Sequence, residues 1–206
     1  MLDSAGLLLR LDGRMLWRVG TQGEKVVFLT FDDGPAPEVT PWVLDMLKSL
    51  GVKATFFCIG RNITAHRDLF ERMRCEGHAV GNHTWDHPNG WRTGTLAYYR
   101  SVLACQELTG TDLFRPPYGR VTNRQLDALR RRFTVVMWDV LAYDFDDRWT
   151  DRSRVAEVLR QVRPGSVIVF HDSLKCAARM RASMPKVVEA LLEQGYRFGT
   201  LPYART

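Results

Sequence analysis

The sequence predicts an α/β protein whose strands are parallel and belong to a single domain. Two observations support this fold class. Short apolar runs rich in β-branched and aromatic residues, such as 26–29 (VVFL) and 166–170 (SVIVF), are typical of buried strands. Between such runs, apolar residues recur at helical spacing, and glycine follows the last of them. The 206 residues leave room for about six or seven strands, in either a small barrel or an open doubly wound sheet.

The first half of the chain alternates strand and helix. Thr40 followed by Pro41 predicts a capped helix start, and Gly51 ends that helix after about ten residues. The other elements expected here are a strand at 24–29, a strand at 53–59, a turn at Gly60, a helix at 65–76 ended by Gly77, a strand at 78–83, a helix at 95–108 closed by Gly110 and a strand at 113–115. Two prolines are expected to cut the last strand short.

The second half repeats the pattern. The run FTVVMWDV predicts one strand over 133–140. The remaining elements are helices at 125–132, 153–162 and 184–194, a turn at Pro164–Gly165, a strand at 166–170 that ends on His171, and a closing strand at 196–201. Strands that alternate with helices favour a parallel sheet, whose carboxyl ends meet at one mouth.

Basic residues outnumber acidic ones by 29 to 23, for a formal net charge of +6. This excess is spread along the chain, and its densest runs, 130–132 and 179–181, are expected to be helical. Such runs are typical of solvated helix faces, so we predict no nucleic-acid partner. The cysteines show no CxxC spacing and are expected to be buried free thiols: Cys58, Cys75, Cys105 and Cys176.

The first residues indicate neither export nor a membrane anchor. Between Met1 and Gly20 the main apolar stretch, 6–9, is interrupted by Arg10 and is too short for a signal peptide or a bilayer span. We therefore expect an N-terminal extension over 1–24 and a single catalytic domain over 25–206, cytoplasmic as written and assumed monomeric. An envelope location would fit a trimmed chain or another export route.

Polar residues gather where the expected strands end. These clusters are Asp32–Asp33, His83 with His87, 115–118, Asp144, and His171–Asp172. Because the carboxyl ends of parallel strands open at the same mouth, we expect the clusters to form one site.

Asp32 and Asp33 follow a strand directly, and neighbouring side chains on an extended backbone point in opposite directions. One carboxylate can therefore hold a metal while the other handles protons. His83 and His87 have i, i+4 spacing, which lets both imidazoles reach one ion from a single helical turn. With Asp33 as third ligand, the ion would keep an open position for water, as hydrolysis requires. A strand-end turn and a pair of surface histidines are the structural alternatives.

Four short motifs occur in order along the chain: TFDDGP at 30–35, HTWDH at 83–87, RPPYG at 115–119 and VFHD at 169–172. In this order and spacing they resemble the polysaccharide deacetylase domain, also called the NodB-homology domain or carbohydrate esterase family 4. The resemblance spans about 26–201 and implies a distorted (β/α)7 barrel, in agreement with the alternation of strands and helices.

The resemblance implies how the first motifs would work. Asp32 would be the catalytic base, oriented by Arg115. Asp33, His83 and His87 would hold a divalent metal ion, with zinc expected and cobalt or nickel as alternatives. From the residues alone, Arg115 could equally form a surface ion pair.

The later motifs would complete the reaction. The backbone N–H of Tyr118 would stabilise an oxyanion. His171 would protonate the departing amine, and Asp144 would raise the basicity of that histidine. The residues alone leave open a core aromatic for Tyr118, a satisfied core histidine for His171 and a loop cap for Asp144.

The sequence departs from the family pattern around the acyl pocket. Leu141 and Phe145 stand where Asp and Trp are common, and Phe170 stands where Leu usually precedes the His-Asp pair. We therefore expect a reshaped but apolar acetyl pocket, with substrate contacts from Pro117, Tyr118, Phe145 and Phe170. Tryptophans that could stack on sugar rings are Trp85, Trp91, Trp138 and Trp149, of which Trp138 is expected in the core.

The function that follows is a metal-dependent hydrolase. It would remove N-linked acetyl groups from an amino-sugar polymer or oligomer, with peptidoglycan or chitin-like N-acetylglucosamine as the substrate class. Water deprotonated by Asp32 would attack the acetyl carbonyl and release acetate and a free amine. An O-acetyl esterase or a small-amide amidase would use the same site. A catalytically silent carbohydrate-binding module is the third hypothesis, but such a module needs no base, metal and acid together.

Overall fold

The computed structural model describes residues 12–201 and contains one sheet of eight strands. The strands are β1 (Val26–Asp32), β2 (Thr55–Cys58), β3 (Ala79–Asn82), β4 (Leu113–Phe114), β5 (Thr134–Val135), β6 (Val140–Leu141), β7 (Val167–His171) and β8 (Arg197–Gly199). Their order is β5-β4-β3-β2-β1-β7-β6, and β8 pairs with the start of β1. All of these pairings are parallel. The expected parallel α/β fold is therefore confirmed.

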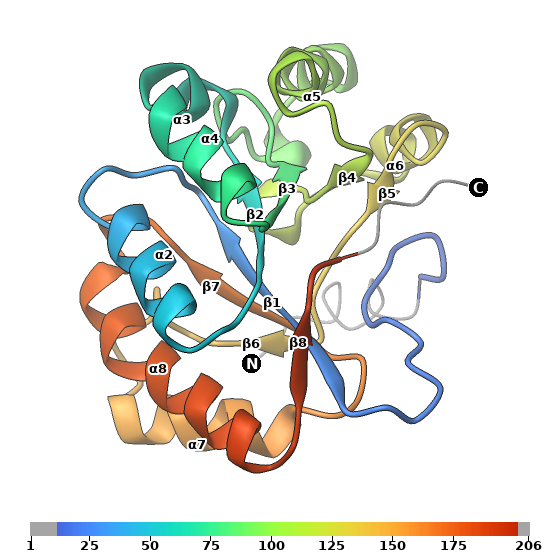
Figure 1. The fold of residues 1–206 in the computed structure, drawn as a ribbon. Helices are drawn as coiled ribbons and strands as arrows, with labels where there is room; N and C mark the ends of the chain where they lie inside the picture. The colour runs from blue at the N-terminus through green and yellow to red at the C-terminus, as the bar shows by residue number, and fades with distance from the viewer. Residues whose placement is uncertain (1–11, 202–206) are drawn as a thin grey trace.

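Helices form an outer layer around the curled sheet (Figure 1). They are α2 (Thr40–Ser49), α3 (Gly60–Ala65), α4 (Arg67–Cys75), α5 (Thr95–Thr109), α6 (Asn123–Leu129), α7 (Asp151–Gln161) and α8 (Ala177–Glu193), with short 3-10 turns η1 (Gly90–Arg92) and η2 (Pro117–Gly119). In Figure 1, α2, α7 and α8 lie along one side of the strands, and α3 to α6 along the other. Among residues 12–201, no helix is both long and apolar enough to cross a membrane.

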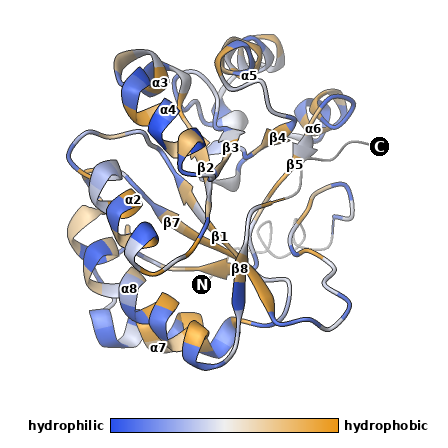
Figure 2. Ribbon diagram, in the orientation of Figure 1, coloured by the Kyte–Doolittle hydropathy of each residue, from blue (hydrophilic) through white to orange (hydrophobic). Residues whose placement is uncertain are grey.

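The central strand β1 divides its side chains between two faces. Val27, Leu29 and Phe31 are buried in the largest apolar cluster, which α2 and α8 cover from outside. The alternate residue Phe28 belongs to a separate cluster with residues such as Phe57. Because strand side chains alternate, Asp32 shares the face of Phe28 and ends that face at the carboxyl edge of the sheet. Figure 2 shows these apolar strands at the centre of the molecule.

One long strand expected from the sequence is absent. The run 133–140 is divided between β5 and β6. Between them, Val136 forms an isolated bridge with Leu16, and Met137 N donates to Leu16 O at 2.8 Å. The apolar run is thus buried as expected, but the amino-terminal segment supplies its partner at this point.

Two helices begin elsewhere than expected. Gly60 starts α3 instead of forming a turn, and a Cβ at this position would lie 2.7 Å from the Trp85 ring. Helix α8 starts at Ala177 and contains Pro185, near which the sequence predicted the helix to begin. The added first turns bury Ala177 and Met180 against the main core, so tertiary packing outweighs the proline signal.

The amino-terminal segment packs closely on the barrel from residue 12 onwards. Met15 is buried in the cluster beneath α5 and α6, and Arg18 forms an antiparallel bridge with Ser166. Val19 N donates to Gly165 O at 2.9 Å. Residues 12–24 therefore add contacts to the sheet, while the division into an extension and a domain at residue 24 stays a prediction.

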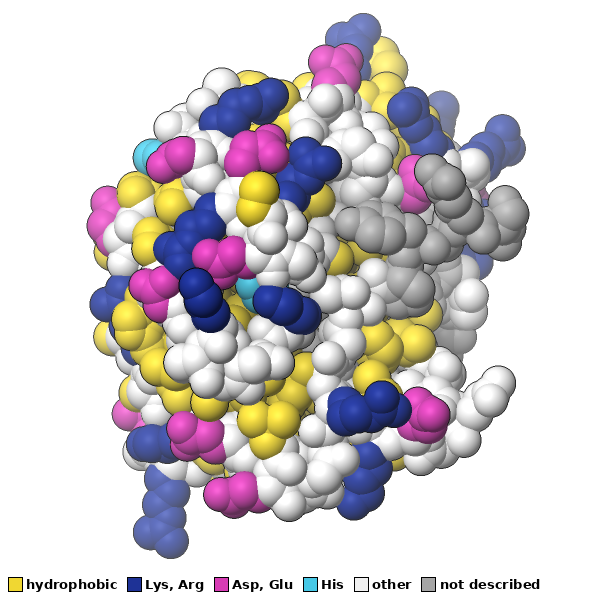
Figure 3. All heavy atoms as spheres, in the orientation of Figure 1, with side chains coloured by type: hydrophobic (Ala, Val, Ile, Leu, Met, Phe, Trp, Pro, Cys, Tyr) yellow, Lys and Arg dark blue, Asp and Glu magenta, His cyan; other side chains and the backbone are white. Residues whose placement is uncertain are grey.

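Charged side chains are dispersed over the surface, as expected from the sequence. Figure 3 shows basic and acidic side chains mixed over one face. The run 130–132 is exposed as expected but lies after the end of α6 at Leu129, so its expected helical position is wrong. Arg179 is half-buried and donates from Nε to the carbonyl of Asp144 at 2.6 Å. All cysteines are free, as expected, but Cys75 is exposed and only Cys58, Cys105 and Cys176 are buried.

Candidate active site

The polar clusters converge on one cavity of about 550 Å³ at the carboxyl ends of the strands. Its polar wall includes Asp32, Asp33, His83, His87 and His171. Its apolar wall is formed by Trp138, Leu141 and Phe145. Parallel strands that end at one mouth bring these residues together from distant parts of the chain.

Asp32 is the last residue of β1 and is 3% exposed. Arg115 Nη1 donates to Asp32 Oδ1 at 2.7 Å and to Thr30 Oγ1 at 2.8 Å. Arg115 is fully buried, and its guanidinium stacks on Phe57 at 4.1 Å from the ring centroid. Burial lowers the pKa of Arg115, although the Asp32 charge opposes this effect. The alternative of a surface ion pair is thus excluded, because this pair is buried.

Asp33, His83 and His87 present ligand atoms that all lie within 4.8 Å of one another. Asp33 Oδ1 is 3.7 Å from His83 Nε2 and 3.2 Å from His87 Nε2. That oxygen is buried and forms no hydrogen bond with another described residue. Two imidazole nitrogens and one carboxylate oxygen are a donor set that suits a tetrahedral divalent ion with an open position. The residues therefore fit the expected metal.

His83 is held in the form that binds a metal. Its Nδ1 lies 2.8 Å from the carbonyl oxygen of Arg115, which can only accept a hydrogen bond. The ring proton therefore sits on Nδ1, and Nε2 is left with a lone pair that faces Asp33. Burial lowers the pKa of His83 to about 4, which also favours the neutral imidazole.

The expectation of a single helical turn for the two histidines is wrong. Both lie in an irregular loop after β3, in which Thr84 has φ 68° and His87 has φ 60°. Asn82 Oδ1 accepts from Thr84 N at 2.8 Å, and Thr84 Oγ1 accepts from His87 N at 3.0 Å. Side-chain hydrogen bonds to the backbone hold this loop, as is usual for Asn and Thr in turns.

His171 and Asp144 form a hydrogen-bonded pair. His171 Nδ1 lies 2.8 Å from Asp144 Oδ1, and His171 N donates to Asp144 Oδ2 at 2.7 Å. Asp144 is fully buried. Burial alone would lower the pKa of His171, but the Asp144 carboxylate and its hydrogen bond outweigh burial and raise the pKa to about 9. His171 is 20% exposed and lines the cavity, so it is no core histidine.

The substrate contacts expected from the sequence are partly wrong. Tyr118 (59% exposed) and Phe145 (40% exposed) line the cavity. Phe170 is fully buried beside Phe31, because it precedes His171 on β7 and points to the opposite face. Pro117 is buried at the start of η2 and is not part of the cavity wall. Neither Phe170 nor Pro117 therefore faces the cavity.

Other wall residues were missed. Trp138, expected in the core, lines the cavity, as do Arg120, Ser173, Lys175 and Cys176. The sequence signal that could have identified them is their position: Arg120 directly follows RPPYG, and Ser173, Lys175 and Cys176 lie within four residues after VFHD.

Asp172 lies behind the site and does not line the cavity. It is fully buried, and its Oδ1 accepts from Gly34 N at 3.0 Å. Its Oδ2 accepts from the Thr40 hydroxyl at 2.6 Å, and that hydroxyl accepts from Ala36 N at 2.8 Å. Thr40 therefore does not cap α2 as expected, since its hydroxyl is used here. Burial raises the pKa of Asp172 to about 7.

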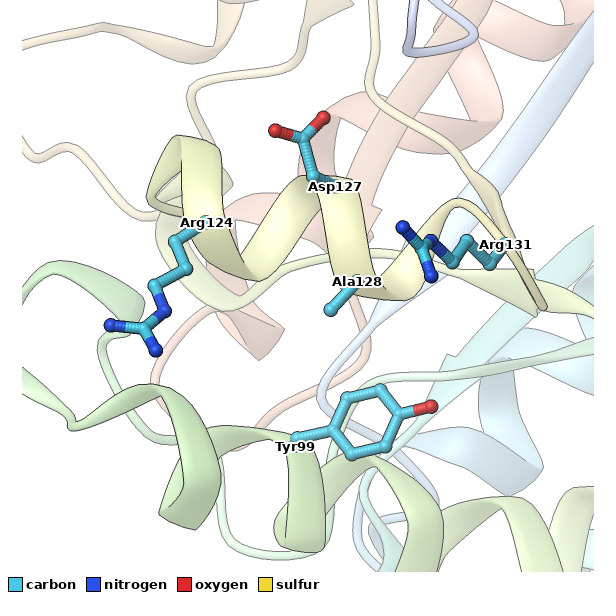
Figure 4. A pocket seen from close by; sticks show the side chains of 5 residues that line it. All are labelled: Tyr99, Arg124, Asp127, Ala128 and Arg131. Carbon is cyan, nitrogen blue, oxygen red and sulfur yellow. The ribbon is translucent and has the colours of Figure 1, made fainter.

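A second hollow of about 430 Å³ lies outside the barrel between α5 and α6 (Figure 4). It is lined by Tyr99 from α5, by Arg124, Asp127 and Ala128 from α6, and by Arg131 from the turn after α6. Asp127 pairs with Arg14 at 2.9 Å. None of the residues expected in the site lies in this hollow.

Comparison with known proteins identifies the family. The family model for polysaccharide deacetylase matches residues 19–133. A peptidoglycan-N-acetylglucosamine deacetylase of Bacillus cereus is 35% identical over 89% of this chain and 69% of its own length. A chitooligosaccharide deacetylase of Azorhizobium caulinodans is 33% identical over 88% of this chain and 95% of its own length.

Longer proteins share only this region. The peptidoglycan-N-acetylglucosamine deacetylase PgdA of Listeria monocytogenes is 37% identical over 86% of this chain, and the match covers 38% of the length of PgdA.

The crystal structure of the Bc1960 peptidoglycan N-acetylglucosamine deacetylase superposes with a TM-score of 0.86 at 32% identity, covering 92% of this chain and 91% of that one. The distorted barrel is thereby confirmed. The chain belongs to the polysaccharide deacetylase family, carbohydrate esterase family 4.

Proposed function

We propose that this protein removes N-linked acetyl groups from N-acetylglucosamine units of an amino-sugar glycan. The observation that carries the proposal is that a buried carboxylate, a metal-fitting triad and a carboxylate-bound histidine all face one cavity. A neutral amide requires an activated water, stabilisation of an oxyanion and an acid for the amine. These residues can meet each requirement.

Asp32 is assigned the base. Arg115 binds Oδ1 and fixes the carboxylate at the cavity wall, so that Oδ2 can accept a proton from the attacking water. A divalent cation held by Asp33, His83 and His87 would acidify that water and polarise the acetyl carbonyl. Zinc is proposed because it favours mixed imidazole and carboxylate ligands, with cobalt or nickel as alternatives.

His171 is assigned the acid. Asp144 holds Nδ1, which leaves Nε2 to face the cavity, and the raised pKa keeps the imidazole protonated at neutral pH. The proton would pass from Nε2 to the departing amine. The backbone N–H of Tyr118 is assigned to the oxyanion.

The acetyl methyl is assigned to the apolar wall. Leu141, Phe145 and Trp138 line it, and the Phe145 ring meets His171 edge-on at 5.7 Å between centroids. An apolar wall next to the acid suits an acetyl group better than a charged acyl group.

Acetate release from N-acetylglucosamine oligomers and muropeptides, with and without chelator, tests the proposal. We expect chelation to abolish acetate release and added zinc to restore it. The substitution Asp32→Asn should lower the rate of acetate release at least about a hundredfold. The control is Asp139→Asn, because Asp139 does not line the cavity. Its Oδ1 accepts a hydrogen bond of 2.8 Å from Val167 N. Metal binding without any effect of chelation or of Asp32→Asn on acetate release would contradict the proposal.

The rival functions give different results in the same assay. Turnover of O-acetylated sugars alone would favour an esterase, and turnover of small amides alone would favour an amidase. Glycan binding that persists without metal, with no acetate released, would favour a silent binding module. The cytoplasmic location expected from residues 1–20 stays a prediction, and an envelope glycan as substrate would require export.

A further inference from the structure

Two basic side chains in the cavity wall have no part in the proposed reaction. Arg120 follows η2, which carries Tyr118, and Lys175 lies in the loop that follows β7 and His171. Both line the same cavity as Asp32. The two residues follow different strands, so they lie on separate parts of the cavity wall and are not neighbours in sequence.

Arg120 is held in place before any substrate binds. Its guanidinium lies over the Trp91 ring, 4.9 Å from the centroid, and Trp91 Nε1 donates to Val121 O at 3.3 Å. Arg120 N donates to Pro117 O at 3.0 Å. A cation over an aromatic face keeps its full charge and its outward N–H groups, so the fork stays available to a planar anion.

Arg120 and Lys175 leave the cavity with an excess of positive charge. Arg115 already neutralises Asp32, and Asp144 is paired with His171. Asp33 is used by the proposed cation. Within residues 12–201, neither Arg120 nor Lys175 has a carboxylate within 4.0 Å. The mouth therefore carries positive charge that an anionic ligand can neutralise.

We infer that Arg120 and Lys175 bind a carboxylate on the glycan and select anionic over neutral substrates. An arginine fork recognises a carboxylate with two parallel hydrogen bonds, and a lysine adds a point charge. The substrate class is then an amino-sugar chain with carboxylate substituents beside the acetylated sugar, as in peptidoglycan with the free carboxylates of its stem peptides. A neutral chitin-like chain offers no such group. This inference rests on the proposed function and names its substrate class.

The test compares one glycan in two charge states with a neutral chain. The substrates are muropeptide oligomers, the same oligomers with amidated carboxylates, and N-acetylglucosamine oligomers of equal length. The variants are Arg120→Met, Lys175→Met and the double variant. Matched controls are Arg131→Met, which removes a charge from the outer hollow of Figure 4, and Lys186→Met on the exposed side of α8.

We expect wild type to prefer the free carboxylates by about tenfold in kcat/KM, chiefly through KM. The double variant should lose that ratio, and added salt should reduce it in wild type. The two controls should keep it. A wild-type ratio near one, or equal losses on all three substrates in the double variant, would overturn the inference.

Binding separates this inference from the reaction itself. Calorimetric titration of the Asp32→Asn protein with free and amidated muropeptides requires no turnover. Tighter binding of the free carboxylates that depends on Arg120 and Lys175 would support the inference even if no acetate were released. Absence of acetate from every substrate would instead contradict the proposed function.

Discussion

Arg115 connects the two halves of the site. Its guanidinium holds Asp32, and its carbonyl oxygen accepts from His83 Nδ1 at 2.8 Å. It also donates from Nη2 to Met137 O at 3.0 Å. One buried residue thereby sets the position of the base and the tautomer of a metal ligand.

Replacing Arg115 is expected to affect stability and activity together. Arg115→Met would leave the Asp32 carboxylate buried without its partner, which costs about 3–5 kcal/mol of unfolding free energy. Urea unfolding measures this loss, and acetate release should fall by at least about a hundredfold. Arg115→Lys keeps the charge but not the fork, so it should recover stability more than activity. Full activity in Arg115→Met would show that Asp32 needs no orientation.

The His171–Asp144 pair predicts how activity depends on pH. Asp144→Asn removes the charge that raises the pKa of His171, while burial, which lowers this pKa, remains. The imidazolium should then be lost at lower pH, so the alkaline limb of the kcat profile should move to lower pH. Profiles of wild type and Asp144→Asn between about pH 5 and 10 measure the shift. An unmoved alkaline limb would exclude His171 as the acid that titrates there.

At the scale of elements, the turn after β1 depends on a residue from the end of β7. Asp172 binds Gly34 N and the Thr40 hydroxyl, and a Cβ at Gly34 would lie 2.1 Å from Asp172 Oδ2. Asn62 Nδ2 also donates to Asp33 O at 2.8 Å. The N–H and the C=O of the Asp33–Gly34 peptide group are therefore both held by partners from other elements.

Asp172→Asn is expected to weaken metal binding, because an amide cannot accept at both of its ends. We expect zinc affinity to fall about tenfold or more, as is usual when support behind a ligand is removed. Competition with a chromogenic chelator measures the affinity. Asp139→Asn serves as the control, since Asp139 accepts from Ser166 and Val167 at the other end of β7. Equal losses in both variants would indicate a general structural effect.

Elements with strong local signals could be predicted, and those decided by distant contacts could not. Helix α5 matches the expected 95–108 closely, and Gly110 ends it with φ 61°. The division between β5 and β6 depends on Leu16, which is far away in sequence. The loop of His83 and His87 depends on side-chain hydrogen bonds, so i, i+4 spacing alone suggested a helical turn. The convergence of the polar clusters on one cavity could be predicted, because the strand ends of a parallel sheet meet at one mouth.

At the scale of the whole molecule, residues 12–24 pack against the barrel. Leu16 bridges Val136 next to β5, the first strand in the sheet order, and Arg18 bridges Ser166 just before β7, the second strand from the other edge. A Cβ at Gly165 would lie 1.9 Å from Val19 O, and Gly165 has φ +86°. Only glycine allows this approach of the two backbones.

Gly165→Ala is therefore expected to destabilise the fold without altering the chemistry of the site. Gly110→Ala is the matched control, because Gly110 also has positive φ but has no atom within 4 Å of an added Cβ. The control should cost about 1 kcal/mol, and Gly165→Ala should cost more because the segment must move. Denaturant unfolding measures both. Equal losses would show that the contact with Val19 contributes nothing.

The pairing of β1 with β7 sets Asp32 directly beside His171. The backbones that carry the proposed proton acceptor and proton donor are thus paired neighbours, about 4.8 Å apart as in any sheet. Main-chain hydrogen bonds maintain that interval whatever residues occupy the surrounding loops. Substitutions in the loops that carry Arg120 and Lys175 can therefore change which glycan binds without moving the strands that carry Asp32 and His171. Substrate specificity can thus change while the arrangement of the catalytic residues stays the same.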